Sequence, residues 1–285
     1  MSQPEVHITS RGVDRIASGH PWIYRSDVKS AGAVKPGAVV RVLERKGRFW
    51  GQALWSDKSQ IALRMLTREQ RAFDRAFLAE RIAQAAAYRA IVTGGAQAYR
   101  LVSSEGDLLP SLVVDRYVDA LVIQTLSQGM ELLKADVVEI LMEQFRPRAI
   151  LERNDVAVRA LEGLPEQKGL LAGEDVREVV VEENKAKFRV DLIGGQKTGE
   201  FLDQRENRAA ARRYAGGRLL DCFCYTGGFA LTLASQCESA LGLDSSADAL
   251  AAAHGNQELN GLQNIEWREA NCFDFLKAAD HEGAR

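Results

Sequence analysis

The sequence of 285 residues predicts a multidomain chain with a small N-terminal β-barrel, a central α+β domain and a C-terminal Rossmann-like α/β domain. Three observations favour this division. Short β-like runs separated by turns fill the first 70 residues, strands and amphipathic helices alternate in the middle, and a strand, glycine turn and helix follow near Asp221. A chain of this length is expected to form two or three domains. We place them at residues 1–70, 71–178 and 179–285.

The N-terminal segment has the composition of a small mixed barrel with a cationic surface. Its expected elements are strands Glu5–Thr9, Ala38–Leu43, Phe49–Trp55 and Ile61–Leu66, with a helical stretch near Val13–Ser18. Residues 1–70 hold twelve Lys and Arg against six Asp and Glu, a net charge of +6; since the whole chain carries −2, the remainder carries −8. Cationic side chains release counterions from phosphates, so a polyanion is the expected partner, with a solvated surface as the alternative.

The middle of the chain predicts a linking helix and then a compact α+β domain. Apolar residues recur at helical spacing from Arg68 to about Ala90. The expected elements after it are strands Leu112–Asp115 and Ala120–Thr125, helix Leu132–Phe145 and strand Ala149–Glu152. The charged groups Asp115-Arg116 and Arg153-Asn154-Asp155 could line an RNA groove, although surface ion pairs and turn caps are the commoner explanation.

The C-terminal third predicts a hairpin followed by three parallel strands. The hairpin strands are Val179–Val181 and Ala186–Leu192, and the hairpin can hold the next loop over a pocket. The later elements are the strand from Leu219 to Asp221, helix Phe229–Ala234, strand Ala240–Leu243 before Asp244, helix Ser246–Leu259 with Ser245 or Ser246 as N-cap, and strand Ile265–Arg268 before Asn271. Gly227 and Gly228 let backbone approach a ligand, so the pocket is expected at this turn.

The pattern of acids at this pocket favours S-adenosylmethionine over a dinucleotide. The turn lacks the GxGxxG spacing of a pyrophosphate site, and its strand ends in Asp221, which suits a ligand amino group. Asp244 follows 23 residues later, about the interval at which a βαβ unit places an acid against ribose hydroxyls. Asn271 lies on a loop that can bond adenine.

The loop Gln196–Arg208, QKTGEFLDQRENR, together with YTGGF makes a more specific resemblance visible. With GHPWIY, DLLPSLVVDRY and RNDVAVRALEGL elsewhere, the chain resembles class I S-adenosylmethionine-dependent ribosomal RNA methyltransferases with an N-terminal PUA domain. Within them it is most similar to those that methylate cytosine C5 of large-subunit RNA. The resemblance covers the whole chain and implies a PUA-like barrel, which binds structured RNA through shape and backbone contacts.

The resemblance also implies roles for residues that match its motifs. The implied cofactor residues are Phe201, Gln204, Asp221, Phe223, Tyr225, Thr226, Gly227, Gly228, Asp244, Ser245, Asn271 and Cys272. Glu200 departs from the family, which often has an aromatic residue there, and Asn271 stands where Asp is common; its carbonyl can still accept from an amino group. The RNA-binding candidates are Arg15, His20, Arg25, Lys46 and Arg48. His20 and Trp22 could equally be core or turn residues.

Cations near the pocket leave further alternatives open. Lys197 and Arg205 could reach a phosphate or the cofactor carboxylate. Arg208, Arg212 and Arg213 lie on an expected helix that could face RNA, although spaced arginines on a helix are more often simply solvated.

No catalytic residue is expected within the span. Methylation of cytosine C5 needs a thiolate that adds to C6, but Cys222 and Cys224 fit buried packing or a pocket wall better, Cys237 a helix end and Cys272 a pocket residue. The last proline is Pro165, so the Asp-Pro-Pro motif that follows the fourth strand in similar proteins is absent. We therefore expect a fragment of a longer enzyme with a truncated Rossmann-like domain. The alternative is an RNA-binding module without catalysis; a small-molecule methyltransferase would leave the basic N-terminus unexplained.

Composition limits the other function classes. Four cysteines without paired ligand spacing argue against a disulfide framework or a zinc ribbon, and no metal is expected. The longest uncharged run, Cys222–Cys237, is too short to span a membrane, and Met1–Ser10 has no signal-peptide pattern. We expect a cytoplasmic protein that binds ribosomal RNA and no membrane; its oligomeric state is not indicated.

Overall fold

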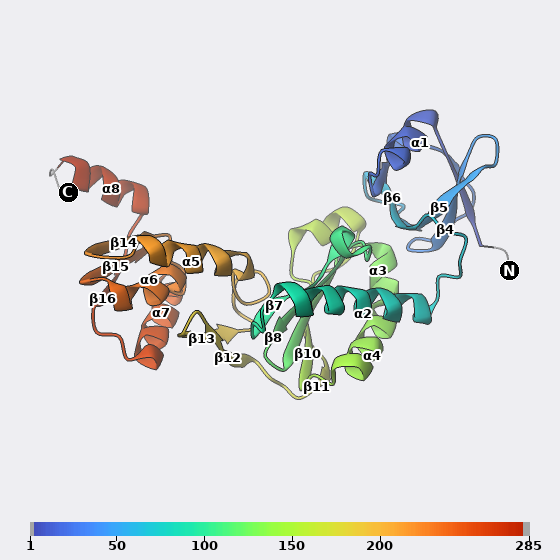
Figure 1. Ribbon diagram of the computed structural model, residues 1–285. Coiled ribbons are helices and arrows are strands. Elements are labelled where there is room, and N and C mark those ends of the chain that lie inside the picture. Colours follow the sequence, from blue (N-terminus) through green and yellow to red (C-terminus); the bar gives the residue numbers. More distant parts are fainter. Residues whose placement is uncertain (1–2, 282–285) are drawn as a thin grey trace. The chain divides into compact units, whose positions relative to one another are not determined.

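The computed structural model describes residues 3–281 and divides into two compact units (Figure 1). The first comprises the chain up to Gly95 together with Tyr99–Val176, and the second comprises Ala96–Ala98 and the chain from Arg177 onward.

The first unit begins with a curved mixed sheet in the order β2-β6-β5-β4-β1-β3. Its elements are β1 Glu5–Ile8, α1 Ser10–Ala17, β2 Trp22–Tyr24, β3 Val28–Ala31, β4 Val39–Glu44, β5 Phe49–Trp55 and β6 Ile61–Thr67. Strand β1 runs parallel to β4 and the other neighbours are antiparallel. Ile16 of α1 packs with Val6, Val42 and Leu63 of the sheet into one apolar core. Among the described residues no pairing joins the edge strands β2 and β3, so the expected barrel is a half-barrel.

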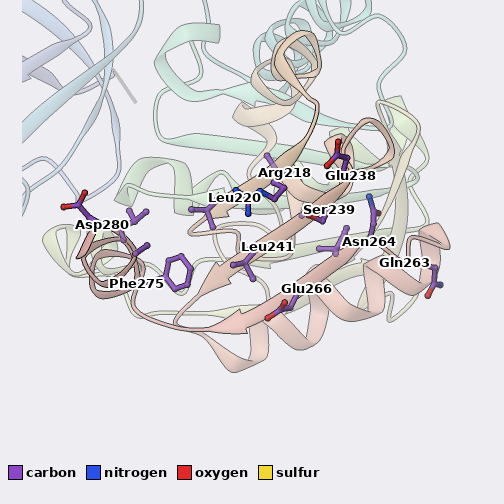
Figure 2. A pocket seen from close by; sticks show the side chains of 15 residues that line it. Arg218, Leu220, Glu238, Ser239, Leu241, Gln263, Asn264, Glu266, Phe275 and Asp280 are labelled. Carbon is purple, nitrogen blue, oxygen red and sulfur yellow. The ribbon is translucent and has the colours of Figure 1, made fainter. Parts of the chain in front are cut away.

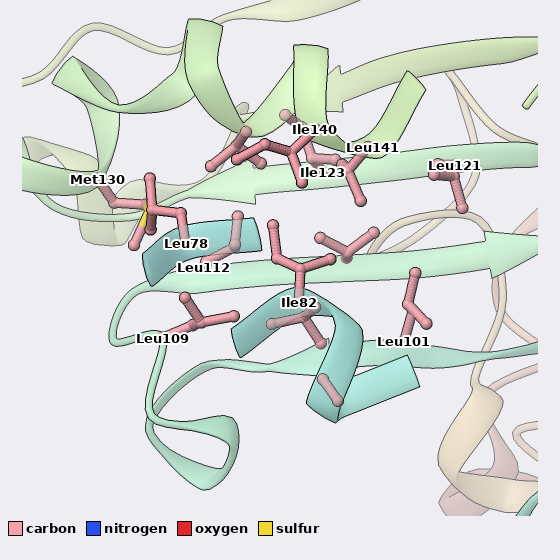
Figure 3. Packing of buried hydrophobic residues seen from close by; sticks show 14 of the residues in the cluster. Leu78, Ile82, Leu101, Leu109, Leu112, Leu121, Ile123, Met130, Ile140 and Leu141 are labelled. Atoms are coloured by element: carbon pink, nitrogen blue, oxygen red, sulfur yellow. The ribbon is translucent and has the colours of Figure 1, made fainter. Parts of the chain in front are cut away.

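The second part of the same unit is a five-stranded sheet covered by helices. The elements are α2 Arg75–Val92, β7 Ala98–Ser103, β8 Leu112–Tyr117, β9 Ala120–Thr125, α3 Gln128–Leu132, α4 Lys134–Phe145, β10 Ala149–Arg153 and β11 Lys168–Gly173, in the sheet order β11-β10-β9-β8-β7. Figure 3 shows Ile82 of α2 and Ile140 of α4 directed toward Leu112 and Ile123 of the sheet. This shared core explains why both helices carry apolar residues at helical spacing.

An ion pair and two hydrogen bonds connect the half-barrel to this α+β part within the first unit. Arg64 of β6 forms a buried ion pair with Glu162, with 2.8 Å between NH2 and Oε1. The amide of Gln128 donates to Asp57 at 2.7 Å, and the indole of Trp22 donates to Glu105 at 2.8 Å. The half-barrel and the α+β part therefore form one compact body.

The second unit contains a hairpin and a three-stranded parallel sheet in the order β14-β15-β16. Its elements are β12 Glu178–Glu183, β13 Ala186–Asp191, α5 Arg205–Ala211, β14 Arg218–Cys222, α6 Gly228–Leu233, β15 Ser239–Asp244, α7 Ala247–Asn260, β16 Ile265–Glu269 and α8 Cys272–His281. Asn256 and Asn260 of α7 accept from the backbone N–H groups of Arg189 and Lys187, each at 2.8 Å, so the hairpin is fixed to α7.

The two faces of the parallel sheet differ. On one face Ala240, Ile265 and Trp267 are buried, and α6 and α7 contact these strands. The other face carries a cavity of about 730 Å³ between Leu220 and Leu241 of the strands and Phe275 of α8 (Figure 2). None of the helices within residues 3–281 is both long and apolar enough to span a bilayer.

Candidate functional site

The turn that follows β14 has an unusual backbone conformation. Phe223 and Tyr225 have φ angles of 60° and 49°, and Gly227 has 88°, so every second residue lies in the left-handed region. Such conformations are unfavourable for bulky side chains and persist where surrounding bonds fix them. Here the N–H of Cys224 donates to the Leu243 carbonyl at 2.9 Å, and the N–H of Tyr225 donates to Asp244 Oδ2 at 2.9 Å. The turn is therefore fixed to the end of β15.

Two glycines of this turn are required by their surroundings. A Cβ at Gly227 would lie 2.5 Å from the ring of Trp267, and a Cβ at Gly228 would lie 2.8 Å from NH1 of Arg208. No other residue fits without displacing these side chains. Gly227 and Gly228 were predicted to let the backbone approach a ligand; the structure adds a steric constraint from Trp267 and Arg208.

The two predicted acids lie at the carboxyl ends of neighbouring parallel strands. Asp221 is 9% exposed and its Oδ2 accepts from the N–H of Ala230 at 2.9 Å. Burial raises the pKa of Asp221 to about 6, with a further rise from the charge of Asp244, while the bond from Ala230 and the charge of Arg208 act in the opposite direction. Asp244 Oδ1 accepts from the N–H of Ser246 at 3.0 Å. Both carboxylates are thus held in fixed positions.

These acids line a cavity of about 360 Å³. The predicted residues that line it are Phe201, Gln204, Asp221, Phe223, Tyr225, Gly228 and Asp244. Six residues that the sequence did not assign to the cofactor also line it, namely Gln196, Glu200, Arg208, Cys222, Cys224 and Phe229, of which Cys222 and Cys224 were expected as buried packing or as a pocket wall. Most of these six lie within three positions of a predicted residue, which is the signal that could have found them.

Five predicted residues do not line this cavity. Thr226, which lines a neighbouring cavity of about 510 Å³, donates its hydroxyl to Glu200 Oε2 at 3.0 Å, Gly227 packs on Trp267, and Ser245 is exposed. Cys272 is buried behind the turn, where its sulfur accepts from the N–H of Phe223 at 3.3 Å. Of these residues, Cys272 supports the turn from behind.

Asn271 bonds the start of helix α8, a role that was not predicted from the sequence. Its Oδ1 accepts from the N–H groups of Phe273 and Asp274, at 2.9 and 3.3 Å, at the start of α8. This is the geometry of a helix N-cap. The carbonyl that was expected to meet adenine therefore already accepts two backbone bonds, and its amide nitrogen is the group that can donate outward.

The loop before α5 lies against the turn. The N–H of Gln196 donates to the hydroxyl of Tyr225 at 2.9 Å, and the rings of Phe201 and Tyr225 meet edge to face at 5.3 Å.

The Lys197 ammonium lies 4.1 Å from the centre of the Phe201 ring and pairs with Asp203 at 3.1 Å. Arg205 pairs with Glu206 at 2.8 Å. Both candidate phosphate-binding cations are thus engaged within the loop and α5.

Arg208 is a structural residue of the site, and both alternatives that the sequence left open for it, a contact with RNA and a solvated position, are wrong. It is buried and forms a bidentate pair with Glu183 of β12, at 2.6 Å from Nε to Oε1 and 2.9 Å from NH2 to Oε2. Arg212 donates to the Asn184 carbonyl at 2.8 Å, while Arg213 is exposed. The paired arginine fixes α5 to the hairpin.

The thiols of the site lack the features of a nucleophile. Burial, together with the charges of Asp221 and Asp244, raises the pKa of Cys224 to about 12. Burial and the neighbouring Cys272 raise the pKa of Cys222 as well. A thiol activated for attack has a lowered pKa. The part of the chain that the structure describes also holds no cluster of His, Cys, Asp and Glu that could bind a metal ion.

The RNA-binding candidates of the half-barrel fall into two groups. Arg15 pairs with the buried Asp27 at 2.8 Å, and Arg25 donates from Nε to the Ser59 carbonyl at 3.0 Å, so both stabilise the half-barrel itself. The ring of His20 accepts from the N–H of Trp22 at 3.1 Å. Lys46 and Arg48 are exposed. These two are the candidates with free access to a large polyanion.

The charged groups of the α+β part form bonds within the protein, but most of them are buried, whereas the commoner explanation expected surface ion pairs and turn caps. Arg100 pairs with the buried Asp115 at 2.9 Å, and Arg153 pairs with Asp155 at 3.0 Å. Arg116 donates to the Val118 carbonyl at 2.9 Å. Asn154 is buried and its Oδ1 accepts from the N–H of Thr125 at 2.8 Å. Apart from Arg116, they form ion pairs and buried bonds, and these contacts hold the α+β part together.

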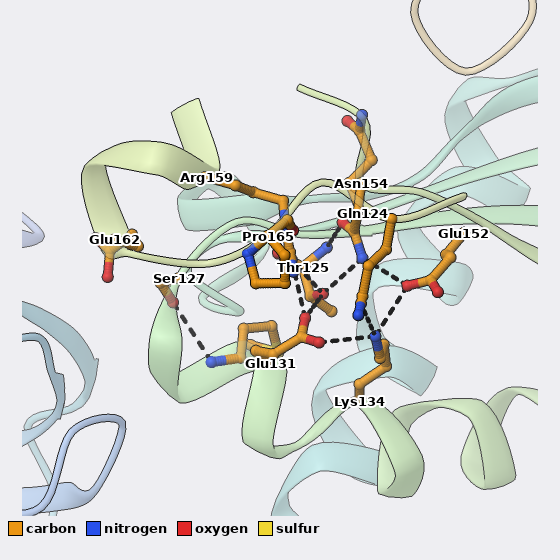
Figure 4. A network of polar contacts seen from close by, with 12 residues as sticks. Gln124, Thr125, Ser127, Glu131, Lys134, Glu152, Asn154, Arg159, Glu162 and Pro165 are labelled. Atoms are coloured by element: carbon orange, nitrogen blue, oxygen red, sulfur yellow. Dashed lines mark hydrogen bonds and ion pairs between the residues drawn. The ribbon is translucent and has the colours of Figure 1, made fainter. Parts of the chain in front are cut away.

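A larger polar network extends from Asn154 (Figure 4). Glu131 accepts from Arg159 at 2.9 Å and from Lys134 at 2.8 Å, and Lys134 also pairs with Glu152 at 2.9 Å. Burial opposes ionisation of Glu131, but the bonds from Arg159, Lys134 and Thr125 lower its pKa to about 2. The network connects α3, α4, β10 and the segment around Arg159, and its buried charges compensate one another.

Comparison with known proteins gives two family matches. Residues 6–68 match a family described as a PUA-like domain, and residues 164–272 match a family described as an S-adenosylmethionine-dependent methyltransferase. The second match includes the loop, the turn, both acids and Cys272.

Curated relatives extend over most of the chain. Proteins named ribosomal RNA large subunit methyltransferase I are 42% identical in Shewanella amazonensis and 43% identical in Tolumonas auensis, each over 93% of this chain. The chain covers 69% and 70% of those relatives. The Vibrio cholerae relative of the same name is 38% identical over 99% of this chain, which covers 74% of it.

Solved structures share the fold over nearly the whole chain. A Streptococcus mutans protein assigned as an S-adenosylmethionine-dependent methyltransferase superposes with a TM-score of 0.83 at 19% identity, over 98% of this chain and 74% of its own. A second protein assigned as a methyltransferase, solved in complex with SAH, superposes with a TM-score of 0.84 at 19% identity, over 99% of this chain and 73% of its own.

Proposed function

The chain belongs to the family of ribosomal RNA large subunit methyltransferase I proteins, and from this premise we propose that it uses S-adenosylmethionine to methylate a base of large-subunit ribosomal RNA. The base that we propose is cytosine, methylated at C5, in the cytoplasm. The half-barrel in residues 1–70 would bind RNA, the α+β domain of residues 71–178 would connect the two ends, and residues 179–285 would bind the cofactor.

The observation that carries the proposal is the pair of carboxylates beside the 360 Å³ cavity. Asp244 retains lone pairs on both oxygens after accepting from Tyr225 and Ser246, so it can accept from two ribose hydroxyls. Asp221 lies at the end of the adjacent strand and can meet the methionine ammonium. The acceptors thus fit the diol and the amino group of the cofactor. When bound, the cofactor supplies a methyl group on a positively charged sulfur.

The turn would orient the cofactor. Gly228 adds no side chain to the cavity wall, and Phe223, Tyr225 and Phe201 add aromatic surface. Asp221 and Asp244 are held by backbone donors before any ligand arrives. Groups held in place in advance lose little entropy on binding. Because Cys224 is protonated at neutral pH, we do not assign it the attack on cytosine C6.

Methyl transfer is tested on the natural full-length protein. Unmodified large-subunit ribosomal RNA is incubated with S-adenosylmethionine and the protein, and the RNA is digested to nucleosides for mass spectrometry. We expect 5-methylcytidine, and none with Asp244→Ala. RNA binding without any methylated nucleoside would instead support the alternative of a binding module without catalysis.

A further inference from the structure

Glu200 places a third carboxylate in the wall of the cofactor cavity. The residue is 8% exposed, although it lies on a loop. The N–H of Phe201 donates to Oε1 at 2.7 Å, and the hydroxyl of Thr226 donates to Oε2 at 3.0 Å. Both of these donors are neutral, and they fix the position of the carboxylate.

The cavity contains more acidic than basic groups. Its charged lining residues are Glu200, Asp221, Asp244 and Arg208. The guanidinium of Arg208 is already paired with Glu183 through Nε and NH2, and its NH1 is 4.0 Å from Glu200 Oε1. One cation is therefore shared between two carboxylates. A partly enclosed cavity with excess negative charge favours the ligand that carries more positive charge.

We propose that Glu200 makes the cavity prefer S-adenosylmethionine over S-adenosylhomocysteine. The two molecules share the ammonium, carboxylate, ribose and adenine, and they differ at sulfur, which is a cationic sulfonium in one and a neutral thioether in the other. The inference rests on the proposed function. It adds a determinant of specificity, because a preference for the sulfonium keeps the product of methyl transfer from occupying the site.

Among the three acids, Glu200 is the one whose charge can be removed with the least change in the geometry of the site. The two oxygens of Asp244 accept from the backbone N–H groups of Tyr225 in the turn and of Ser246 before α7, so loss of Asp244 alters the geometry of the site. Asp221 accepts from the backbone at the start of α6. Glu200, in contrast, can be replaced by Gln, whose carbonyl accepts from Phe201 while its amide meets the Thr226 hydroxyl. Glu200→Gln therefore removes the charge and keeps the shape.

The test is calorimetric titration of S-adenosylmethionine, S-adenosylhomocysteine and sinefungin into the wild-type chain and Glu200→Gln. Sinefungin carries an amine where the sulfonium methyl would be, so it reports on positive charge without reacting. We expect the ratio of the S-adenosylhomocysteine Kd to the S-adenosylmethionine Kd to fall roughly tenfold in Glu200→Gln. Sinefungin should weaken together with S-adenosylmethionine.

Asp203→Asn is the matched control, because Asp203 is an exposed acid near Glu200 that does not line the cavity. It should leave the ratio unchanged. Thr226→Val, which loosens the Glu200 carboxylate, should lower the ratio in the same direction by a smaller factor, and it serves if Glu200→Gln does not fold. An unchanged ratio in folded Glu200→Gln, or equal weakening of all three ligands, would overturn the inference and leave the proposed function standing. Failure of the wild-type chain to bind any of the three would count against the proposed function itself.

Discussion

Asp221 is held in the folded chain at a cost to stability. Its pKa of about 6 lies above the ordinary value of 3.8, because burial and the neighbouring Asp244 disfavour the charged form. Between these two values the folded chain binds more protons than the unfolded chain, so stability falls as the pH rises through this range. Above pH 6 the penalty is fully present. Functional carboxylates commonly carry such a penalty.

Asp221→Asn should therefore stabilise the protein while weakening cofactor binding. The amide keeps an acceptor for the Ala230 N–H and removes the buried charge. We expect the free energy of unfolding to rise by about 2 to 3 kcal/mol at pH 8, and the gain to vanish near pH 4. Urea denaturation of both proteins at the two pH values measures this. A gain of equal size at both pH values would contradict the assigned cause.

Spacing in the sequence located the acids of the site but not the partners of its cations. Asp221 and Asp244 follow from the order of strand, turn and helix, which is local information. The partner of Arg208 is Glu183, 25 residues away on the hairpin, and this pair forms only when α5 packs against β12. Glu200 and Thr226 likewise meet through packing of loop on turn. Contacts between distant segments leave no periodic signal in the sequence.

The turn between β14 and α6 is the element whose backbone defines the cavity. It alternates left-handed residues with ordinary ones, and it is bonded to β15 through Leu243 and Asp244. Its geometry depends on close packing of Gly227 against the Trp267 ring.

Gly227→Ala should distort this element. The added Cβ would lie 2.5 Å from Trp267 at a φ of 88°. We expect a loss of about 2 to 4 kcal/mol of stability and loss of cofactor binding. Gly255→Ala is the control, since Gly255 lies in α7 with open space around its Cβ position, and it should stabilise by up to about 1 kcal/mol. Thermal unfolding measures the stability of both variants, and calorimetry measures their cofactor binding. Equal stability and equal binding in the two variants would refute the steric argument.

The sequence predicted long periodic elements better than short or edge elements. The expected ranges Phe49–Trp55 and Ala120–Thr125 agree with β5 and β9. The elements that were missed are β2, β3, β7, β11, α3 and α8. Strand β2 has three residues and β11 contains two glycines, so neither shows a clear alternation. Helix α8 was missed because Asn271 was interpreted as a ligand residue and not as its N-cap.

At the scale of the whole molecule, the first unit joins the half-barrel to the α+β part through polar contacts. The pair between Arg64 and Glu162 is the most buried of these, with side chains 9% and 1% exposed. Removal of one partner from a buried pair leaves the other charge uncompensated. The joint should therefore be sensitive to single substitutions.

Arg64→Met should cost about 3 kcal/mol of stability and loosen the half-barrel, because Glu162 would remain buried without its cation. Arg41→Met removes an exposed partner of Glu5 and should cost less than about 1 kcal/mol. Urea denaturation gives the two values, and limited proteolysis near residues 68–74 reports on the joint. A similar loss of stability in both variants would show that the buried pair contributes no more than the exposed pair.

RNA affinity should depend on Lys46 and Arg48 together. Both are exposed on the half-barrel, and neutralising them removes counterion release from RNA phosphates. In the double variant Lys46→Ala, Arg48→Ala, we expect weaker binding of ribosomal RNA and a slope of log Kd against log salt smaller by about 1 to 2. Lys168→Ala, an exposed cation outside the half-barrel, is the control. An unchanged slope would exclude these residues as phosphate contacts.

The proposed function depends on cofactor binding in the cavity between the turn after β14 and Asp244. Titration of S-adenosylhomocysteine into the wild-type chain, Asp244→Ala and Asp248→Ala tests it most directly. Asp248 lies in the first turn of α7 and is absent from the lining of this cavity, so it controls for loss of an acid nearby. The account predicts binding by the wild-type chain and Asp248→Ala and none by Asp244→Ala. Binding that survives Asp244→Ala unchanged would contradict it.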